Sequence, residues 1–275
     1  MIIANLRLML ETDYRFSLPV TTGIGRSGVQ RLRRKHPMRD SYPARACFRR
    51  TNMEHRVEGT MKSSFTYSYN TSTDSLTSHF RSYGLIGFLS LALDLFRTKI
   101  FFRGTRLIRF PIFVRGRRSI DFGTRFSSGR GLRIEAFPDS GTTSCLIRIG
   151  KDVRINEDVH IGAMRSIVIG DRVLIASNVF ITDHNHGSYS GIPPQSDPHV
   201  PPQDRILSCA NVIIGDDVWI GEYVVVLPGV QIGKGSIIGA MTTVTRDIPP
   251  YSIAVGSPAR VIKHYNTQTS TWERI

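Results

Sequence analysis

The chain has 275 residues, of which 40% are hydrophobic, a length and composition that suit one large domain or two small ones. Its formal net charge is +14 at pH 7. Residues 1–60 hold half of the positive excess, with 12 Lys and Arg against 5 Asp and Glu, so the charge gives no support to a nucleic-acid-binding fold. The three cysteines, Cys47, Cys145 and Cys209, lack CxxC spacing, which argues against a disulfide framework and indicates a reducing compartment.

Residues 1–80 are predicted to form a disordered basic extension. They contain the run RLRRK at 31–35, several Pro and Gly, and a polar stretch, with few apolar residues in phase. One interpretation is a basic arm for anionic lipid or nucleic acid. The other is an extension without function, read from a start codon upstream of Met53 or Met61. We favour the second, because neither a motif nor a period marks this region.

Residues 81–104 are predicted to form an amphipathic or capping helix. The apolar segment Tyr83–Phe96 is too short to span a bilayer, and the cations Arg97, Lys99 and Arg103 follow it. An apolar helix with basic flanks can lie on an anionic membrane surface. It can also cap a solenoid, whose open end exposes backbone groups and apolar surface. The two interpretations are compatible.

Residues 105–264 carry an aliphatic residue every six positions, most regularly from 214 to 244, and Gly often follows it. A period of six fits neither an α-helix nor an alternating strand. It is typical of a parallel β-helix, in which each unit forms one short strand and a corner, with Gly where backbones approach closely. The fold class is therefore predicted to be all-β. The aliphatic residues at this spacing are Ile149, Ile155, Ile161 and Ile167; after a slip of two residues, Ile169, Ile175 and Ile181; and, beyond the interruption at 182–211, Ile214, Ile220, Val226, Ile232, Ile238 and Val244.

Residues 182–211 interrupt the repeat and are predicted to protrude as a loop. This segment is polar and contains five prolines and three of the eight histidines. A long loop ejected from a regular solenoid usually serves function. The repeat then resumes, and residues 265–275 are predicted to be a C-terminal tail that packs back as a short helix or strand.

Several motifs together resemble the hexapeptide-repeat O-acetyltransferases, in particular the sugar acetyltransferases of bacterial surface polysaccharide synthesis. Besides the repeat, they are DHNHG at 183–187, WIG at 219–221, DIPPYSIAVGSPAR at 247–260 and the final WERI. The resemblance covers residues 82–275. It implies a left-handed β-helix and a homotrimer, with acetyl-CoA and a saccharide acceptor, lipid-linked or free, in clefts between subunits. The implied activity is acetyl transfer to a sugar hydroxyl of O-antigen, lipopolysaccharide or capsule.

A histidine base is expected at such a site, because a sugar hydroxyl does not ionise unaided at pH 7. The loop offers His184 and His186. We predict His186, on which the family's catalytic histidine falls in an ungapped alignment, with His184 as the second candidate. Asp183 or Glu157 is expected to orient the imidazole. Asp183 is also predicted to contact the acceptor, as is Asn156, which matches a family asparagine.

The acetyl-CoA site is expected along the C-terminal coils, where the resemblance places the CoA arm. Cations there suit the phosphates of the nucleotide. The residues in matching positions are Trp219, Ala240, Met241, Thr242, Arg246, Pro258, Ala259, Arg260 and Lys263.

Other functions stay open at this point. The alternatives are a small-molecule acetyltransferase of the maltose, galactoside or serine type, or a non-catalytic scaffold. His160, His184 and His186 could bind Zn²⁺, as in β-helix carbonic anhydrases, but their spacing departs from that pattern and we expect no metal. The chain shows no clean signal peptide and no run of about 18 apolar residues, so a cytoplasmic location is predicted, with peripheral contact at the inner face of the membrane.

Overall fold

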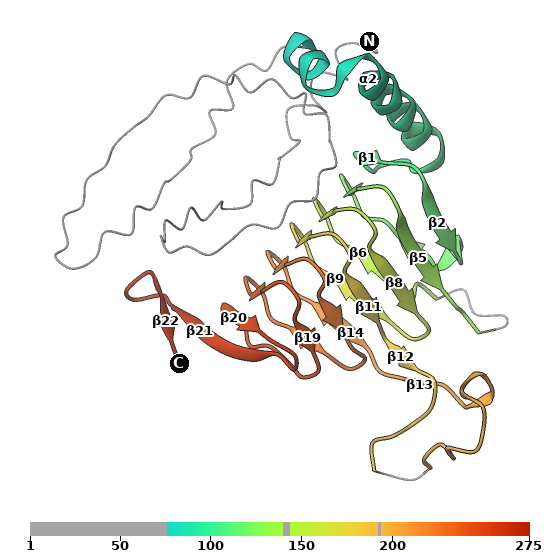
Figure 1. The fold of residues 1–275 in the computed structure, drawn as a ribbon, viewed down its shortest axis with the longest axis vertical. Helices are drawn as coiled ribbons and strands as arrows, with labels where there is room; N and C mark the ends of the chain where they lie inside the picture. The colour runs from blue at the N-terminus through green and yellow to red at the C-terminus, as the bar shows by residue number, and fades with distance from the viewer. Residues whose placement is uncertain (1–75, 140–143, 192–193) are drawn as a thin grey trace, which may run out of the picture. The chain divides into compact units, whose positions relative to one another are not determined.

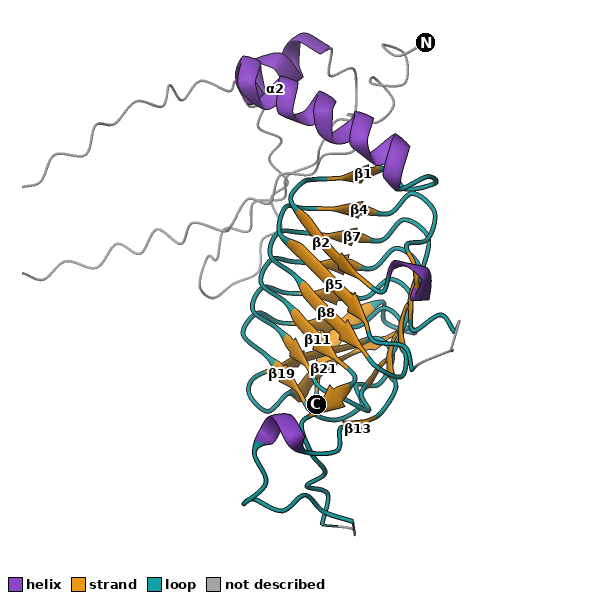
Figure 2. Ribbon diagram, turned by 90° about the vertical axis from the view of Figure 1, so that its right-hand side faces the viewer, coloured by secondary structure: helices purple, strands orange, loops and turns teal. Residues whose placement is uncertain are grey.

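A computed structural model describes residues 76–139, 144–191 and 194–275 (Figure 1). Most of the predicted basic extension, residues 1–75, lies outside the described residues. The chain winds as a left-handed parallel β-helix whose short strands form three sheets, one on each face of a prism (Figure 2). Each regular coil contributes one strand to each sheet, so the period of six in the sequence is the length of one face and its corner.

The first sheet contains, in spatial order, β1 (Leu107–Ile108), β4 (Ser127–Ser128), β7 (Arg154–Ile155), β10 (Leu174–Ile175), β15 (Trp219–Ile220), β18 (Ile237–Ile238), β20 (Ser252–Val255), β21 (Arg260–Asn266) and β22 (Thr271–Arg274). The second contains β2 (Ile112–Arg115), β5 (Leu132–Ala136), β8 (His160–Ala163), β11 (Phe180–Thr182), β16 (Val225–Val226) and β19 (Thr243–Val244). The third contains β3 (Ile120–Asp121), β6 (Ile147–Ile149), β9 (Ile167–Ile169), β14 (Val212–Ile214) and β17 (Gln231–Ile232).

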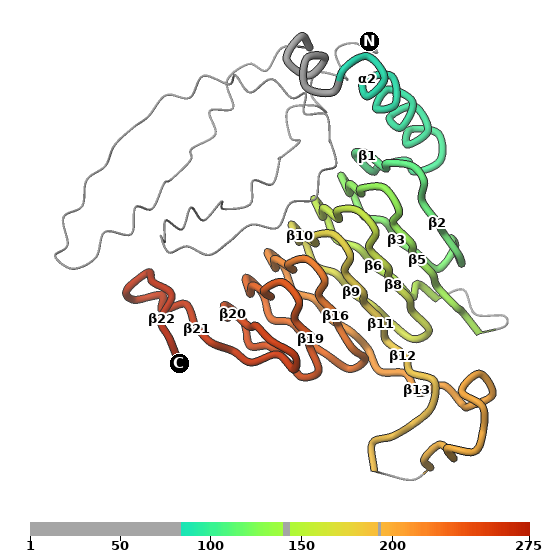
Figure 3. The backbone as a smooth tube through the Cα atoms, viewed as in Figure 1, coloured from blue at the N-terminus to red at the C-terminus, as the bar shows by residue number. Residues whose placement is uncertain are grey.

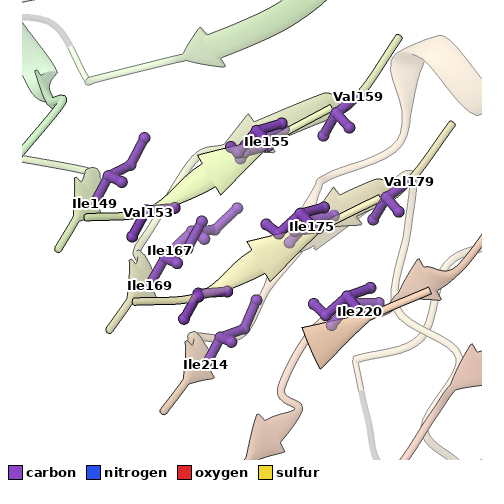
Figure 4. Close-up of a cluster of buried hydrophobic side chains, with 14 of the residues drawn as sticks. Ile149, Val153, Ile155, Val159, Ile167, Ile169, Ile175, Val179, Ile214 and Ile220 are labelled. Carbon is purple, nitrogen blue, oxygen red and sulfur yellow. The ribbon is translucent and has the colours of Figure 1, made fainter. Parts of the chain in front are cut away.

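Aliphatic ladders fill the inside of the prism, as the sequence predicts. In the first sheet Ile155, Ile175, Ile220 and Ile238 are register partners from coil to coil, and all are buried. Figure 4 shows the first three of them among the inward side chains. Burying one such side chain stabilises a fold by about 1.5–3 kcal/mol. Because the ladder repeats through the prism, these residues form one continuous hydrophobic core.

Two kinds of corner turn the chain between faces. At Gly221 an added Cβ would lie 2.7 Å from the backbone nitrogen of Ala240 in the next coil, so the phased Gly is explained by close backbone approach. Other corners adopt positive φ with a side chain present, for example at Asp152 and Asp217 (φ 59° and 58°). At Asp217 the backbone N–H donates to the carbonyl of Asp171 one coil earlier at 2.9 Å, which stabilises the strained conformation.

The helix α2 (Leu76–Phe101) caps the β1 end of the β-helix (Figure 1). It starts before the predicted residue 81 and is interrupted at Gly84 (φ 65°). Leu91 and Leu95 face the core side and are buried. Within the described part of the chain, α2 included, no helix has the length and apolar character needed to cross a bilayer.

Two buried polar side chains of α2 take the place of a missing strand beside β1. The Thr98 hydroxyl accepts the N–H of Ile108 at 2.9 Å and donates to the carbonyl of Asp94 at 2.6 Å. The Asp94 carboxylate accepts the N–H of Phe110 at 3.4 Å and lies 3.4 Å from Arg130. The cap therefore satisfies backbone donors that an open sheet edge would leave unpaired.

At the opposite end, the antiparallel strands β21 and β22 follow β20. Their side chains include the packed pair Tyr265 and Trp272, with ring centroids 5.3 Å apart. Thus the segment 265–275 packs back onto the sheet as a strand.

The Thr98 cap gives a test of this account. Replacing Thr98 with Val keeps the volume but removes the partner of the Ile108 N–H, so we expect the free energy of unfolding to fall by about 1–3 kcal/mol. Chemical denaturation followed by circular dichroism measures the change. The adjacent exposed substitution Lys99→Ala is the control and should leave the free energy within about 0.5 kcal/mol of the parent. Equal stability of Thr98→Val and the parent would show that the cap does not depend on this hydroxyl.

Candidate active site

The loop between β11 and β14 leaves the prism at one corner (Figure 3). Its two ends pair as a short antiparallel hairpin of β12 (His184–Asn185) and β13 (Ser208–Cys209). This hairpin at the base of the loop was not predicted from the sequence. Asp183 anchors it: the side chain is fully buried and its carboxylate accepts the N–H groups of Met164, Arg165 and Ser166 at 2.9, 2.7 and 2.8 Å. Its described contacts thus tie the loop to the corner between β8 and β9.

His184 lies over the second sheet, with one ring nitrogen held in place. Its Nδ1 is 3.1 Å from Oδ1 of Asp183 and 3.2 Å from Oγ1 of Thr182. The ring packs edge-on against Phe137, with centroids 6.1 Å apart, and the side chain is 18% exposed. A carboxylate beside Nδ1 favours the tautomer that leaves Nε2 as a proton acceptor. Of the two predicted orienting carboxylates, Asp183 is the one that contacts His184, whereas Glu157 lies 3.5 Å from Ser177.

His186 stands further out on the loop and its side chain is exposed. Among the described residues its imidazole has no hydrogen-bond partner, so both nitrogens are available. The backbone around it is fixed: the Tyr189 hydroxyl donates to the His186 carbonyl at 2.6 Å, and Arg205 donates to that hydroxyl at 2.6 Å. Ser208 donates to the carbonyl of Gly187 at 2.6 Å. The loop therefore presents His186 on a held backbone.

A row of outward side chains on the second sheet reaches the same place. Phe113, Arg133, His160 and Phe180 are register partners from β2 to β11. In the neighbouring row the partner of Glu135 is Gly162, where an added Cβ would lie 3.5 Å from Cε1 of His184 and 3.8 Å from Nε2 of His160. The absence of a side chain at Gly162 thus leaves room between two imidazoles.

Glu135 contacts two residues of the first row, Arg133 and His160, and was not predicted from the sequence. Its Oε2 lies 2.7 Å from Nε of Arg133 and 3.1 Å from Nε2 of His160. Burial raises the pKa of the Glu135 carboxyl, but the hydrogen bonds from Arg133 and His160 outweigh burial and hold that pKa below its usual value. The sequence does not keep the six-residue repeat between Glu135 and Ile149, so counting by sixes could not have placed Glu135 beside His160.

A groove of about 550 Å³ opens at the β2 end of this row. Arg115, which stacks on the Phe137 ring with its guanidinium carbon 4.7 Å from the centroid, forms part of its wall, and Phe113 is 58% exposed there. An aromatic face beside guanidinium and carboxylate groups can bind a polar ring by stacking and hydrogen bonds. The lining residues are Ile112, Phe113, Val114, Arg115, Arg133 and Glu135.

Asn156 lies at the corner after β7, where its backbone N–H donates to the carbonyl of Ile175 at 2.8 Å. None of the described side-chain contacts joins Asn156 to His184 or His186. The structure therefore places this predicted acceptor contact at a corner of the β-helix.

The residues predicted to bind CoA fall into two groups. One surrounds the corner between β18 and β19, where Oγ1 of the buried Thr242 accepts the N–H of Gly256 at 3.2 Å and the N–H of Ala259 donates to the carbonyl of Thr243 at 2.9 Å. This packing brings Ala240, Met241 and Thr242 close to Pro258, Ala259 and Arg260. Met241 is 74% exposed, and Arg246 and Arg260 are exposed as well.

The second group lies on the first sheet. Trp219, Ile237 and Ile253 are successive register partners, and Lys263 pairs with Ile253 across β20 and β21. Trp219 is 42% exposed. The two groups are thus on different parts of the C-terminal coils. Within the described ranges no three His, Cys, Asp or Glu side chains converge closely enough to hold a metal ion.

The Glu135 network predicts a pH dependence of stability. A carboxyl whose pKa is lowered by folding contributes stability above its unfolded pKa of about 4.3, and this contribution is lost as pH falls through the folded value. Glu135→Gln should therefore lower the free energy of unfolding at neutral pH by about 1 kcal/mol, and the difference from the parent should disappear in acid. Urea unfolding over a pH series measures this. Glu222→Gln, at an exposed corner, should show no such trend, and a pH-independent deficit for Glu135→Gln would contradict the assignment.

Comparison with known proteins agrees with this geometry. Residues 147–183 match the family model described as hexapeptide repeat of succinyl-transferase, and residues 211–246 match bacterial transferase hexapeptide (six repeats). The unmatched segment between them is the loop. The solved structure of AntD, an N-acyltransferase from Bacillus cereus in complex with dTDP and 3-hydroxybutyryl-CoA, superposes with a TM-score of 0.50 at 21% identity, covering 63% of this chain and 90% of AntD, which shows the shared fold.

Two curated relatives come from Escherichia coli K12. The protein named putative lipopolysaccharide biosynthesis O-acetyl transferase WbbJ is 45% identical over 194 residues, covering 70% of this chain and 96% of WbbJ. Galactoside O-acetyltransferase is 38% identical over 120 residues, covering 44% of this chain and 55% of that protein. The chain therefore belongs to the hexapeptide-repeat acetyltransferases and is an acyltransferase.

Proposed function

We propose that the protein transfers an acetyl group from acetyl-CoA to a sugar hydroxyl in bacterial surface polysaccharide synthesis. The observation that carries this proposal is the 45% identity to WbbJ across 96% of its length, because it includes both the β-helix and the histidine loop. A galactoside-type activity on a small free sugar is the second candidate, supported by the 38% identity to galactoside O-acetyltransferase.

The reaction needs a base that removes the hydroxyl proton as the oxygen attacks the thioester carbonyl. We assign this role to His186, whose imidazole is exposed on a fixed backbone with both nitrogens available. His184 is the competing candidate, because Asp183 holds its Nδ1 and leaves Nε2 available. In our assignment His184 and Asp183 support the loop. The Asp183 carboxylate is buried and already accepts three backbone N–H groups, so it acts through His184 and not on the acceptor.

Direct transfer from thioester to sugar fits the described side chains better than an acyl-enzyme. Of the two described thiols, Cys209 is the one whose register partner in the hairpin is His184. Burial, followed by the charge of Asp183, raises the pKa of the Cys209 thiol above its usual value. A thiol kept protonated is a weak nucleophile, so the sugar oxygen is the expected attacking group.

The substrates are proposed to bind on either side of the loop. The groove at Phe113, Arg133 and Glu135 offers stacking and polar contacts for a saccharide, and Asn156 adds a further acceptor contact. Acetyl-CoA would extend along the C-terminal coils, with Arg246, Arg260 and Lys263 near its phosphates and Trp219 and the 240–242 corner beside its chain.

A homotrimer would complete both sites. In one chain His186, Phe113 and Trp219 are all exposed, so each is available to line a cleft with a neighbouring copy. A cleft of that kind excludes water from the thioester, which a single exposed face does not do.

The function is tested on the polysaccharide itself. Cells with and without the protein should yield surface polysaccharides that differ by the mass of one acetyl group on one sugar of the repeat, as measured by mass spectrometry. The purified protein should acetylate the isolated or lipid-linked repeat faster than free galactosides. An unchanged polysaccharide together with rapid acetylation of free galactosides would favour the second candidate.

The assignment of the base is tested with histidine variants. His186→Ala should lower turnover by about 10²–10⁴-fold, because the proton acceptor is removed. Acetyl-CoA affinity should change little, since the imidazole acts on the acceptor. Steady-state kinetics and calorimetry measure these effects.

His199→Ala is the matched control, because His199 belongs to the same loop, is 91% exposed and pairs with Asp197. It should keep parental turnover. A dead His184→Ala variant beside an active His186→Ala variant would transfer the role of base to the Asp183–His184 pair. Parallel-line kinetics would refute direct transfer.

A further inference from the structure

The helix α2 has a second apolar face that points away from the β-helix. We call Ile86, Leu89, Leu93, Phe96 and Ile100 the outer stripe; they are 86%, 58%, 46%, 63% and 50% exposed. Their spacing of three and four residues places them along one side of a helix. Leu91, Leu95 and Thr98, which form the cap, occupy the opposite side. The fold thus uses only one of the two apolar faces.

An exposed apolar face of this size has to be explained. A surface helix of a globular protein normally turns charged and polar residues outward. Contiguous exposed apolar patches mark sites that contact a partner or a membrane. Every side chain of the outer stripe is at least 46% exposed, so much of its apolar surface stays in water in the single chain.

The charges beside the outer stripe identify the partner. Lys99 and Arg103 are exposed, and Arg97 lies half-buried with its guanidinium carbon 5.3 Å from the Phe110 ring centroid. The segment from 84 to 104 contains a single acidic residue, Asp94, which is 3% exposed and faces the cap. An apolar stripe flanked by cations alone is complementary to the headgroup layer of an anionic membrane.

A second copy of the helix fits this face less well. The stripe has the spacing of the core positions of a coiled coil, but the flanking positions carry Ser90, Ala92, Arg97 and Lys99. Paired helices need opposite charges at these flanks, whereas two copies would bring like charges together. Two heptads are also short for a stable coiled coil.

We propose that the outer stripe of α2 docks the protein on a membrane surface rich in anionic lipid. The helix lies in the plane of the interface, with the stripe among the upper acyl chains and Lys99 and Arg103 at the headgroups. Because α2 packs on β1, and β1 and β2 follow each other in the first coil, docking holds the groove beside Phe113 near the lipid. This last consequence rests on the proposed function; the docking itself does not.

Vesicle co-sedimentation of the full-length protein tests the proposal. The protein should sediment with vesicles of phosphatidylcholine and phosphatidylglycerol, and much less with phosphatidylcholine alone. Leu93→Gln with Phe96→Gln should lower the partition coefficient by at least about tenfold, because two inserted apolar side chains are lost. The matched control, Ile262→Gln with Ile275→Gln, removes two exposed apolar side chains at the other end of the chain and should bind as the parent does.

The contribution of charge is tested separately. Lys99→Ala with Arg103→Ala should weaken binding to the anionic vesicles and reduce its dependence on salt concentration. Should the Leu93 and Phe96 variant fold poorly, a polarity-sensitive dye on Leu93→Cys gives a second measurement. Its emission should shift to the blue with anionic vesicles, and the same dye on Ile275→Cys should not respond.

Three outcomes would overturn the proposal. The first is equal vesicle binding by the parent and the outer-stripe variant. The second is an emission of the dye on Leu93→Cys that does not shift when anionic vesicles are added. The third is a lower molar mass of the outer-stripe variant than of the parent in solution without lipid. The last would show by light scattering that a second copy of the chain covers the stripe. Acetyl transfer to a soluble acceptor should be unchanged in the outer-stripe variant, so a failure of docking is distinguishable from a failure of the proposed function.

Discussion

Hydrogen bonds from coil to coil are the constraint on which the rest of this structure depends. The strands of the regular coils are only two to five residues long, and each pairs with strands of neighbouring coils. Thus the N–H of His160 donates to the carbonyl of Val179, and the N–H of Phe180 donates to that of Val224, both at 2.9 Å. Since this ladder fixes the coil spacing, each side chain lies above the same position of the next coil. Inward positions are therefore mostly apolar, because burying a polar group without a partner costs free energy. Ser128, the register partner of Ile108 and Ile155, is an exception, since its buried hydroxyl has no hydrogen-bond partner among the described residues.

The same stacking assembles chemistry on the outer faces. Glu135, Gly162 and Thr182 are register partners from three successive coils of the second sheet, and the Glu135 carboxylate reaches His160 in the neighbouring row. Gly162 leaves space between His160 and His184, and Asp183 ties the loop down by accepting three backbone N–H groups. The candidate site thus consists of a rigid face and an anchored loop, an arrangement that holds reacting groups in fixed positions.

The ends of the β-helix are where the coil-to-coil ladder lacks a partner. At one end Asp94 and Thr98 of α2 supply hydrogen bonds to the backbone of β1 and its neighbour, although both side chains are polar and buried. At the other end the antiparallel pair β21 and β22 extends the first sheet. Only one side of the capping helix packs on the β-helix, so its other side faces outward. The side turned outward is available for another surface, and its sequence is apolar.

The sequence by itself determined the β-helix, because a period of six is a local property and each aliphatic residue is inward whatever the other coils do. It also determined the position of the loop, since the repeat stops at 182 and resumes at 212. Only the tertiary structure decided that Asp183 supports the loop from a buried position, that Glu135 joins Arg133 to His160, and that α2 caps with one face. Each of these depends on contacts between residues of different coils or of coil and helix. The break in the six-residue repeat of the sequence between Glu135 and Ile149 and the interruption of α2 at Gly84 remove the constant spacing from which such contacts could have been counted.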